Sequence, residues 1–222
     1  MAMTIIYPGM DWNGTVVNTL DKTINGKDNA NYPPSANNAS KTALTWRKYL
    51  DEQYANGIWN TNACPIVIRY AEVLLTYAEA VNELSGPSAD VYDKLDLIRG
   101  RVGMPKVDRE KYASKETLRR LIRRERGVEL AGEGVRRADI LRWKDDNGKM
   151  VAETVLNGVL ERVVGTVNYA ETDPTKRAEI DTNAPATDKK IEDRVFKVHN
   201  RYNPIPQGAI DNNPNLEQNP GY

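Results

Sequence analysis

Three glutamates spaced four residues apart are the residues most able to do chemistry in this 222-residue chain: Glu125, Glu129 and Glu133. On a helix, this spacing places all three side chains on one face. Hydrolysis of a glycosidic bond needs two carboxyl groups that flank the bond from opposite sides, and one helix face does not provide them. We therefore favour a structural interpretation, in which the glutamates form ion pairs with arginines of neighbouring helices. The candidate partners are Arg69, Arg126, Arg136 and Arg142.

Soft metal ligands are scarce in the sequence. His199 is the only histidine and Cys64 the only cysteine, so these residue types cannot supply the four ligands of a zinc site. The sequence therefore predicts no metal and no cofactor. We expect Cys64 to be a buried, small apolar residue without a catalytic role.

The charge balance argues against nucleic acid as a partner. Lys and Arg together number 31, as do Asp and Glu, so no overall positive potential attracts a phosphate backbone. Residues 119–126 are locally rich in arginine, which fits either a basic recognition helix or a solvated, salt-bridged face. We favour the second interpretation. No apolar stretch is long enough to cross a membrane, and the first residues lack the features of a signal peptide, so the chain is either cytosolic or a piece of a longer protein.

The elements that must position these residues are mainly helical. Residues 1–62 are rich in Asn, Gly, Pro and Thr and predict loops with one or two short strands. A strongly apolar helix is expected from Pro65 to Leu84, buried on most of its circumference. Further helices are expected at 88–102, 114–130 with Ser114 as N-cap, 136–144 and 150–164. The polar stretch 166–194 predicts a long surface loop.

The first two predicted helices form a hairpin with the length of one tetratricopeptide-like unit. Such a unit cannot bury its own faces, and about three are needed for stability. We find no second copy at the same period, which favours a chain truncated at its N-terminus. We expect a loop-rich segment, 1–62, and a C-terminal region, 63–222, that belong to a single domain.

Several segments are similar to the C-terminal region of the SusD/RagB family, and they occur in the same order. The apolar helix is similar to the family's hallmark helix, and the Pro- and Asn-rich tail resembles the family's C-terminus. The similar segments are residues 65–80, 98–105, 124–134, 141–144 and 203–222. Residues 4–9 also resemble a segment that lies mid-chain in full-length members.

This resemblance implies a mainly α fold: a tetratricopeptide-like helical hairpin, additional helices and long irregular loops within a larger α superhelix. It also implies a cell-surface lipoprotein of Bacteroidetes-type bacteria, whose lipid anchor in the outer membrane lies outside this chain. Members of the family bind oligosaccharides and act as the lid of a TonB-dependent, SusC-like transporter. The resemblance thus predicts a non-enzymatic glycan-binding subunit in polysaccharide uptake.

Sugar binding needs flat aromatic faces beside amide or charged hydrogen-bonding groups. The candidates lie in the Asn-rich first segment: Trp12, Tyr32, Tyr54 and Trp59. A role in anchoring a loop to the core is the alternative for each of them. Trp143, on a predicted apolar helix face, is expected to be buried.

Two other functions remain open at this point. The chain could be an interaction scaffold that docks the transporter without binding sugar, or, on weaker grounds, a glycoside hydrolase. The tail from Asn203 to Tyr222 is stiffened by four prolines, and we expect it to lie against the helices without touching sugar.

Overall fold

The structure, a computed structural model, describes residues 4–33, 39–50 and 64–222. The chain divides into two compact units. One unit comprises residues 64–138, and the other comprises residues 1–63 together with residues 139–222. Trp59 and Tyr54, two of the predicted sugar contacts, lie outside the described residues.

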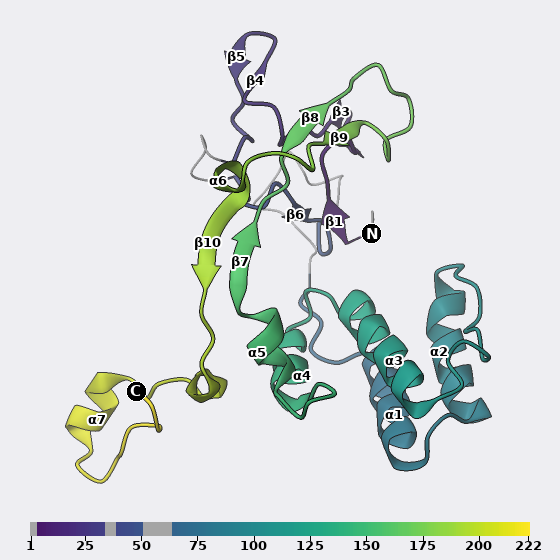
Figure 1. Ribbon diagram of the computed structural model, residues 1–222, viewed down its shortest axis with the longest axis vertical. Helices are drawn as coiled ribbons and strands as arrows, with labels where there is room; N and C mark the ends of the chain where they lie inside the picture. The colour runs from purple at the N-terminus through teal and green to yellow at the C-terminus, as the bar shows by residue number, and fades with distance from the viewer. Residues whose placement is uncertain (1–3, 34–38, 51–63) are drawn as a thin grey trace. The chain divides into compact units, whose positions relative to one another are not determined.

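The unit formed by residues 64–138 is helical (Figure 1). Its helices are α1 (Tyr70–Ser85), α2 (Ala89–Arg101) and α3 (Lys115–Glu129), and α4 (Arg136–Arg142) begins at its end. Helix α1 packs against both α2 and α3. Buried aliphatic side chains from all three helices form one core, which includes Leu75, Leu95, Leu118, Leu121 and Ile122.

Short-range signals determine where these helices begin and end. The side chain of Ser88 accepts a hydrogen bond from the amide of Val91 at the start of α2. Ser114 is the N-cap of α3, as the sequence predicted, and it forms a reciprocal capping box with Thr117. Gly86, with a φ of 82°, ends α1 in a conformation that costs glycine little.

Three expectations for this unit are wrong. The first helix begins at Tyr70 rather than near Pro65, because Arg69 has an extended backbone with φ −140° and ψ 160°. Cys64 lies before the helix and is exposed rather than buried. Several apolar side chains of α1 are also exposed, so this helix is not buried on most of its circumference.

The other unit contains the short strands of the chain. Each strand is paired with one other in a two-stranded antiparallel ladder. In the first part of the chain, the pairs are β1 (Ile5–Ile6) with β6 (Thr45–Trp46), β2 (Asp11–Trp12) with β3 (Thr15–Val16), and β4 (Thr23–Ile24) with β5 (Lys27–Asp28). In the last part, they are β7 (Gly158–Glu161) with β10 (Lys190–Arg194), and β8 (Gly165–Val167) with β9 (Ala178–Ile180). The remaining elements are α5 (Val151–Val155), α6 (Ala186–Lys189), the 3₁₀ helix η2 (Val198–Arg201) and α7 (Gln207–Asn212).

Two of these hairpins have the same local cause. Asn13–Gly14 and Asn25–Gly26 each place two successive residues at positive φ, between 48° and 75°. A two-residue Asn-Gly turn of this kind matches the twist of the strands on either side of it. The turn chemistry thus favours the β2–β3 and β4–β5 hairpins locally.

Distant pairing produces the strands that the sequence did not predict. The expected helix over 150–164 ends at Val155, and residues 158–161 form β7 instead. The expected loop over 166–194 contains β9, α6 and β10. Strand β10 pairs with β7, from Lys190 with Glu161 to Arg194 with Gly158, and local sequence patterns do not show this distant contact. Trp143 is buried, as predicted.

Candidate functional site

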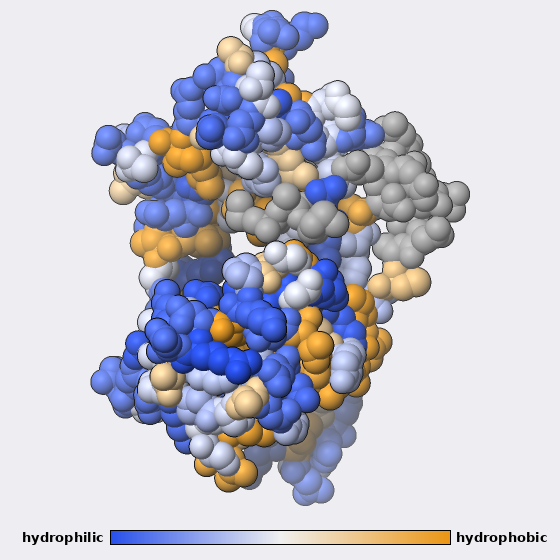
Figure 2. All heavy atoms as spheres, turned by 90° about the vertical axis from the view of Figure 1, so that its right-hand side faces the viewer, coloured by the Kyte–Doolittle hydropathy of each residue, from blue (hydrophilic) through white to orange (hydrophobic). Residues whose placement is uncertain are grey.

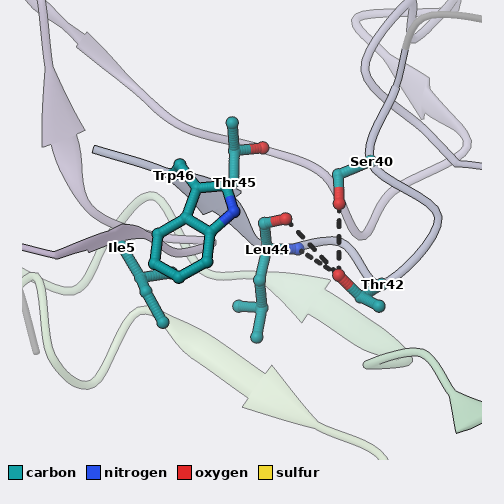
Figure 3. Close-up of a pocket in the computed structure, with 6 residues that line it drawn as sticks. All are labelled: Ile5, Ser40, Thr42, Leu44, Thr45 and Trp46. Atoms are coloured by element: carbon teal, nitrogen blue, oxygen red, sulfur yellow. Dashed lines mark hydrogen bonds between the residues drawn. The ribbon is translucent and has the colours of Figure 1, made fainter. Parts of the chain in front are cut away.

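A pocket of about 380 Å³ lies beside the β1–β6 ladder (Figure 3). Its size falls within the roughly 300–1,000 Å³ usual for small-molecule sites. Its lining residues are Ile5, Ser40, Thr42, Leu44, Thr45 and Trp46. Ile5 is the direct cross-strand partner of Trp46, so their side chains emerge from the same face of the ladder.

Trp46 gives the pocket an exposed aromatic surface. Its side chain is 54% exposed, although a tryptophan that served only the core would be covered. Backbone hydrogen bonds hold the residue after it, since the amides of Arg47 and Lys48 both donate to the carbonyl oxygen of Thr4. The indole is therefore accessible to a ligand while its strand is fixed.

Hydroxyl groups provide the polar part of the lining. The hydroxyls of Ser40 and Thr42 lie 3.1 Å apart and share a hydrogen bond. The Thr42 hydroxyl also faces the backbone of Leu44, with both its amide and its carbonyl at 3.4 Å. Aliphatic side chains, an indole face and uncharged hydroxyls meet here, which is the chemistry that a sugar ring requires, with its apolar C–H face and polar rim.

The predicted residue Trp12 lies near this ladder but does not line the pocket. The guanidinium of Arg47, which follows Trp46, lies over the Trp12 ring at 5.0 Å from its centroid. Trp12 is half-buried. One face of its indole is thus occupied by an arginine of this same chain.

Tyr32 is also half-buried, and Arg162 lies over its ring at 5.7 Å. The structure does not bring it into the lining of the pocket. Trp46, which does line the pocket, is not among the residues that the sequence singles out. The signal that could have found it is the Thr45–Trp46 pair, whose β-branched and aromatic types favour a strand opposite Ile5 and Ile6.

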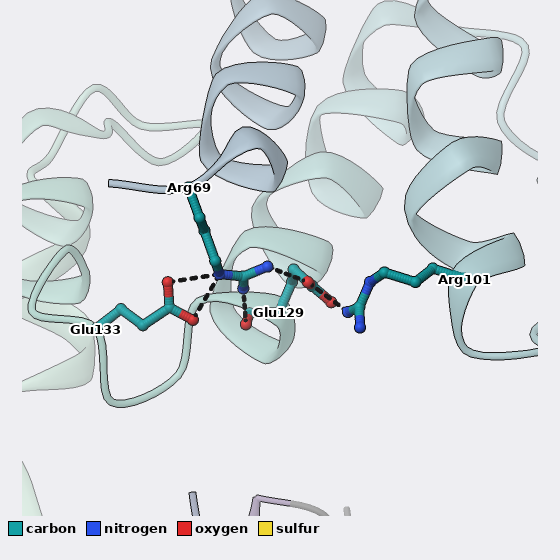
Figure 4. Close-up of polar contacts among 4 residues, drawn as sticks. All are labelled: Arg69, Arg101, Glu129 and Glu133. Atoms are coloured by element: carbon teal, nitrogen blue, oxygen red, sulfur yellow. Dashed lines mark hydrogen bonds and ion pairs between the residues drawn. The ribbon is translucent and has the colours of Figure 1, made fainter. Parts of the chain in front are cut away.

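Of the four arginines predicted as partners, Arg69 meets Glu129 and Glu133 in the helical unit (Figure 4), whereas Arg142 pairs with Asp139. Arg69 Nε lies 2.8 Å from Glu133 Oε2, and Arg69 Nη1 lies 2.5 Å from Glu129 Oε1. Arg69 Nη2 donates to the backbone carbonyl of Glu129, and Arg101 approaches the same Glu129 carboxylate at 2.6 Å. Hydrogen bonds to Glu133 raise the pKa of Arg69 above its ordinary value despite the opposing effect of burial, and Glu129 adds to the rise.

The third glutamate has a different partner from those expected. Arg99 of α2 binds Glu125 at 2.5 Å and also donates to the carbonyl of Pro105. Arg126 lies 3.6 Å from Glu79 and donates to Thr76, both on α1. Arg136 lies beside Gly127, where an added Cβ would be 3.5 Å from its Nη1. These side chains join α1, α2 and α3, and the three glutamates contact arginines rather than facing each other across a cleft.

Part of the arginine-rich stretch of α3 forms ion pairs with α1. Arg119 makes two charge-assisted hydrogen bonds with Glu83 of α1, at 2.5 and 2.6 Å. These bonds lower the pKa of Glu83 below its ordinary value. The contacts are those of a salt-bridged helix face rather than of a helix that reads nucleic acid.

Within residues 4–33, 39–50 and 64–222, no group of three or more His, Cys, Asp or Glu side chains is arranged to hold a metal ion. No helix of the described residues combines the length and apolarity needed to cross a membrane.

Comparison with known proteins places the whole chain in one group. The family model described as "SusD family" matches residues 1–222. Two SusD-like proteins of Formosa agariphila, P25 and P2, are 34% and 30% identical to this chain over 154 and 140 residues. The matched stretches cover 64% and 58% of this chain but only 29% and 28% of those relatives.

Solved structures with a similar fold are also SusD-like proteins. A SusD-like protein from Bacteroides fragilis superposes with a TM-score of 0.70 at 24% identity, over 99% of this chain and 37% of that one. A SusD homologue from Bacteroides thetaiotaomicron gives 0.54 at 26% identity, over 82% of this chain and 32% of that one. The chain thus has the fold of about one third of these longer proteins.

Proposed function

This chain belongs to the SusD family, and on that premise we propose that it is part of a non-enzymatic glycan-binding protein that serves polysaccharide uptake. The observation that carries the proposal is the exposed Trp46 in a pocket lined by hydroxyl and aliphatic side chains. The relatives' names describe them as SusD-like and name no ligand.

The proposed mechanism is stacking with hydrogen bonding. The apolar C–H face of a sugar ring would lie on the Trp46 indole, beside the aliphatic side chains of Ile5 and Leu44. The hydroxyls of Ser40, Thr42 and Thr45 would exchange hydrogen bonds with the ring's hydroxyl groups. Each stacked aromatic contributes modestly, so we expect a single pocket to bind weakly, with dissociation constants from micromolar to millimolar.

The aromatic residues that the sequence suggested as sugar contacts, Trp12, Tyr32 and Trp59, do not share one role in this proposal. Arg47 covers one face of Trp12, and Tyr32 lies outside the pocket lining. We therefore propose Trp46 as the primary contact and Trp12 as the residue that helps to fix Arg47 and β6. Trp59 remains a candidate contact from sequence alone.

We also propose that the protein works at the outer surface of the outer membrane, held by a lipid anchor, as the lid of a TonB-dependent SusC-like transporter. What supports this is family membership together with the apolar surface of the helical unit. The same apolar surface favours the second candidate function, a scaffold that docks other protein without binding sugar.

Binding measurements separate these two functions. Affinity electrophoresis of the 222-residue chain through gels that contain individual polysaccharides should show retardation with at least one polymer. Isothermal titration with oligosaccharides of that polymer should then give a stoichiometry near one. If no polysaccharide in a broad panel retards the chain, and the chain still binds the transporter, the scaffold function is correct.

A further inference from the structure

Basic residues, and no acidic ones, occur in the described segments that form the Trp46 pocket. These segments are β1, residues 39–50 and residues 162–164. The last of them adjoins the pocket because the amide of Val163 donates to the carbonyl of Thr42 at 3.3 Å. We call the three together the pocket segments. They contain no Asp or Glu, and their basic residues are Lys41, Arg47, Lys48 and Arg162.

A region of one sign is an exception in this chain. Basic and acidic residues are equal in number overall, 31 of each. Hydrophilic residues, blue in Figure 2, cover much of the surface shown there. A stretch of average composition would therefore contain both signs. The pocket segments instead carry a local excess of positive charge, which attracts anions to the pocket.

Two acidic residues that lie close to the pocket segments in sequence already face basic partners. Asp11 binds Arg177 at 2.6 Å, and Glu161 lies opposite Lys190 in the β7–β10 ladder. Residues 51–52 are also acidic and lie outside the described residues. Among the described residues, the positive charge of the pocket segments is thus not matched by these two carboxylates.

Two arginines of the pocket segments are held by aromatic rings. The guanidinium of Arg47 lies over Trp12, and that of Arg162 lies over Tyr32 at 5.7 Å from the ring centroid. Arg162 Nε also donates to the carbonyl of Asp188 at 2.5 Å. A guanidinium over a ring keeps its N–H groups in a fixed plane, and such a fork matches the oxygens of a carboxylate or a sulfate. Two rings that the sequence suggested as sugar contacts thus orient cations.

The pocket lining itself is uncharged, so it can stack a sugar ring but cannot select for charge. Lys41 and Arg47 are each next in sequence to a lining residue. Their charges therefore lie within about 10 Å of the pocket, the distance over which attraction persists in 0.1 M salt. Stacking by the lining and charge recognition by its neighbours are separate contributions to binding.

We propose that the Trp46 pocket takes an acidic glycan, whose sugars carry uronate carboxylates or sulfate esters. The inference rests on the proposed glycan-binding function and names its substrate class. The sugar ring stacks on Trp46, and its anionic group lies toward Arg47 and Lys41. Charge-assisted hydrogen bonds of this kind are stronger than those between neutral groups, so the charged sugar binds more tightly than its neutral counterpart.

Oligosaccharide pairs that differ only in charge test this. Galacturonate oligosaccharides and their methyl esters share one backbone, as do sulfated galactan oligosaccharides and their desulfated forms. In isothermal titration of the 222-residue chain at low salt, the charged member of at least one pair should bind at least tenfold more tightly than its neutral partner. The pair that responds distinguishes carboxylate from sulfate. Salt of about 0.5 M should remove most of the difference.

A lysine variant with a matched control locates the effect. Lys41→Gln should weaken binding of the charged oligosaccharide about threefold, as expected for one exposed ion pair, and leave the neutral one unchanged. Lys41 is exposed, so the substitution should not disturb folding. Lys106→Gln makes the same change at an exposed position of the helical unit and should alter neither affinity.

The outcomes separate this inference from the proposed function. Neutral oligosaccharides or polysaccharides that bind as tightly as the charged ones would overturn the acidic-glycan inference and leave glycan binding intact. Charged oligosaccharides whose binding survives both Lys41→Gln and Trp46→Ala would place the anion elsewhere and also overturn it. Binding of single-stranded DNA but of no glycan, or of neither, would overturn both.

Discussion

Arg69 donates hydrogen bonds from Nε to both carboxylate oxygens of Glu133, at 2.8 and 3.0 Å, and so joins the start of α1 to the turn that follows α3. The same guanidinium binds the Glu129 carboxylate and its backbone carbonyl. The Glu133 side chain is only 3% exposed and that of Glu129 11%. Both carboxylates are thus nearly buried, and Arg69 is their common partner.

Replacing Arg69 should therefore destabilise the folded chain. We expect Arg69→Met to lower the free energy of unfolding by about 2–4 kcal/mol, because two nearly buried carboxylates lose their common partner. Urea unfolding followed by circular dichroism measures this loss. Arg101→Met is the matched control: Arg101 binds the same Glu129, but its side chain is 57% exposed, so the change should be below about 1 kcal/mol. Equal effects of the two substitutions would contradict the structural role of Arg69.

The ion pair between Glu83 and Arg119 predicts that the stability of the chain depends on pH. Hydrogen bonds from Arg119 hold the pKa of Glu83 below its ordinary value of 4.5. A lowered folded-state pKa means that this contribution to stability is present above pH 4.5 and is lost as the pH falls through the folded-state pKa. An NMR titration of the Glu83 carboxyl should give a value below 4.5 in the native chain and a higher one in Arg119→Gln. A titration that Arg119→Gln leaves unchanged would show that this pair does not persist in solution.

Gly165 permits the β8–β9 pairing. A Cβ at this position would overlap the carbonyl oxygen of Glu179 and lie 3.0 Å from the Cα of Ile180, its strand partner. We expect Gly165→Ala to destabilise the chain by about 1–3 kcal/mol and to increase hydrogen exchange at the amide of Asn168, which donates to the carbonyl of Arg177 across this pair of strands. Gly208→Ala is the control, since nothing lies within 4 Å of its added Cβ. Unchanged exchange in Gly165→Ala would mean that the two strands are not paired as described.

Glu125 and Glu129 of α3, and Glu133 in the turn that follows it, should have no hydrolytic role. Glu125 binds Arg99, and the three carboxylates contact arginines instead of facing one another across a bond. Reducing-sugar assays on polysaccharides that bind the chain should show no release above the buffer blank. Release by the native chain that disappears in Glu125→Gln would reverse the assignment as a non-enzyme.

The sequence predicted the local features of the fold better than the distant ones. The Ser114 cap and the burial of Trp143 depend on neighbouring residues and on helical spacing, and both are confirmed. Pro65 is compatible with a first helical turn but does not require one, and the helix begins five residues later. The β7–β10 pair joins residues whose types alone favour no strand, so only tertiary contact produces it.

In the candidate site too, contacts between distant residues were harder to predict than local features. Arg69, Glu129 and Glu133 were predicted to pair because charged residues at helical spacing need partners, and the structure brings them together. Glu125 was predicted to pair, but its partner Arg99 was not among the candidates, because helix-to-helix register cannot be read from one sequence. The sequence does not indicate that Trp46 lines a pocket, because the pocket also needs Ile5 and Thr42, which become its neighbours only after folding.

The tail closes on itself through side-chain hydrogen bonds. Gln218 both donates to and accepts from the backbone of Ile205, and the Tyr222 hydroxyl donates to the carbonyl of Tyr202. The ring of Tyr222 packs edge-on against His199 at 4.9 Å. The expected packing of this tail against the helices remains a prediction.

Trp46 as the sugar contact is tested by calorimetric titration of Trp46→Ala with the oligosaccharide that the native chain binds most tightly. We expect at least a tenfold loss of affinity, because the stacking surface of the pocket is removed, and little change in melting temperature, because Trp46 is 54% exposed. Thr42→Val should weaken binding less, because it removes a single hydroxyl. Native affinity in Trp46→Ala would contradict the account and place the sugar elsewhere on the protein.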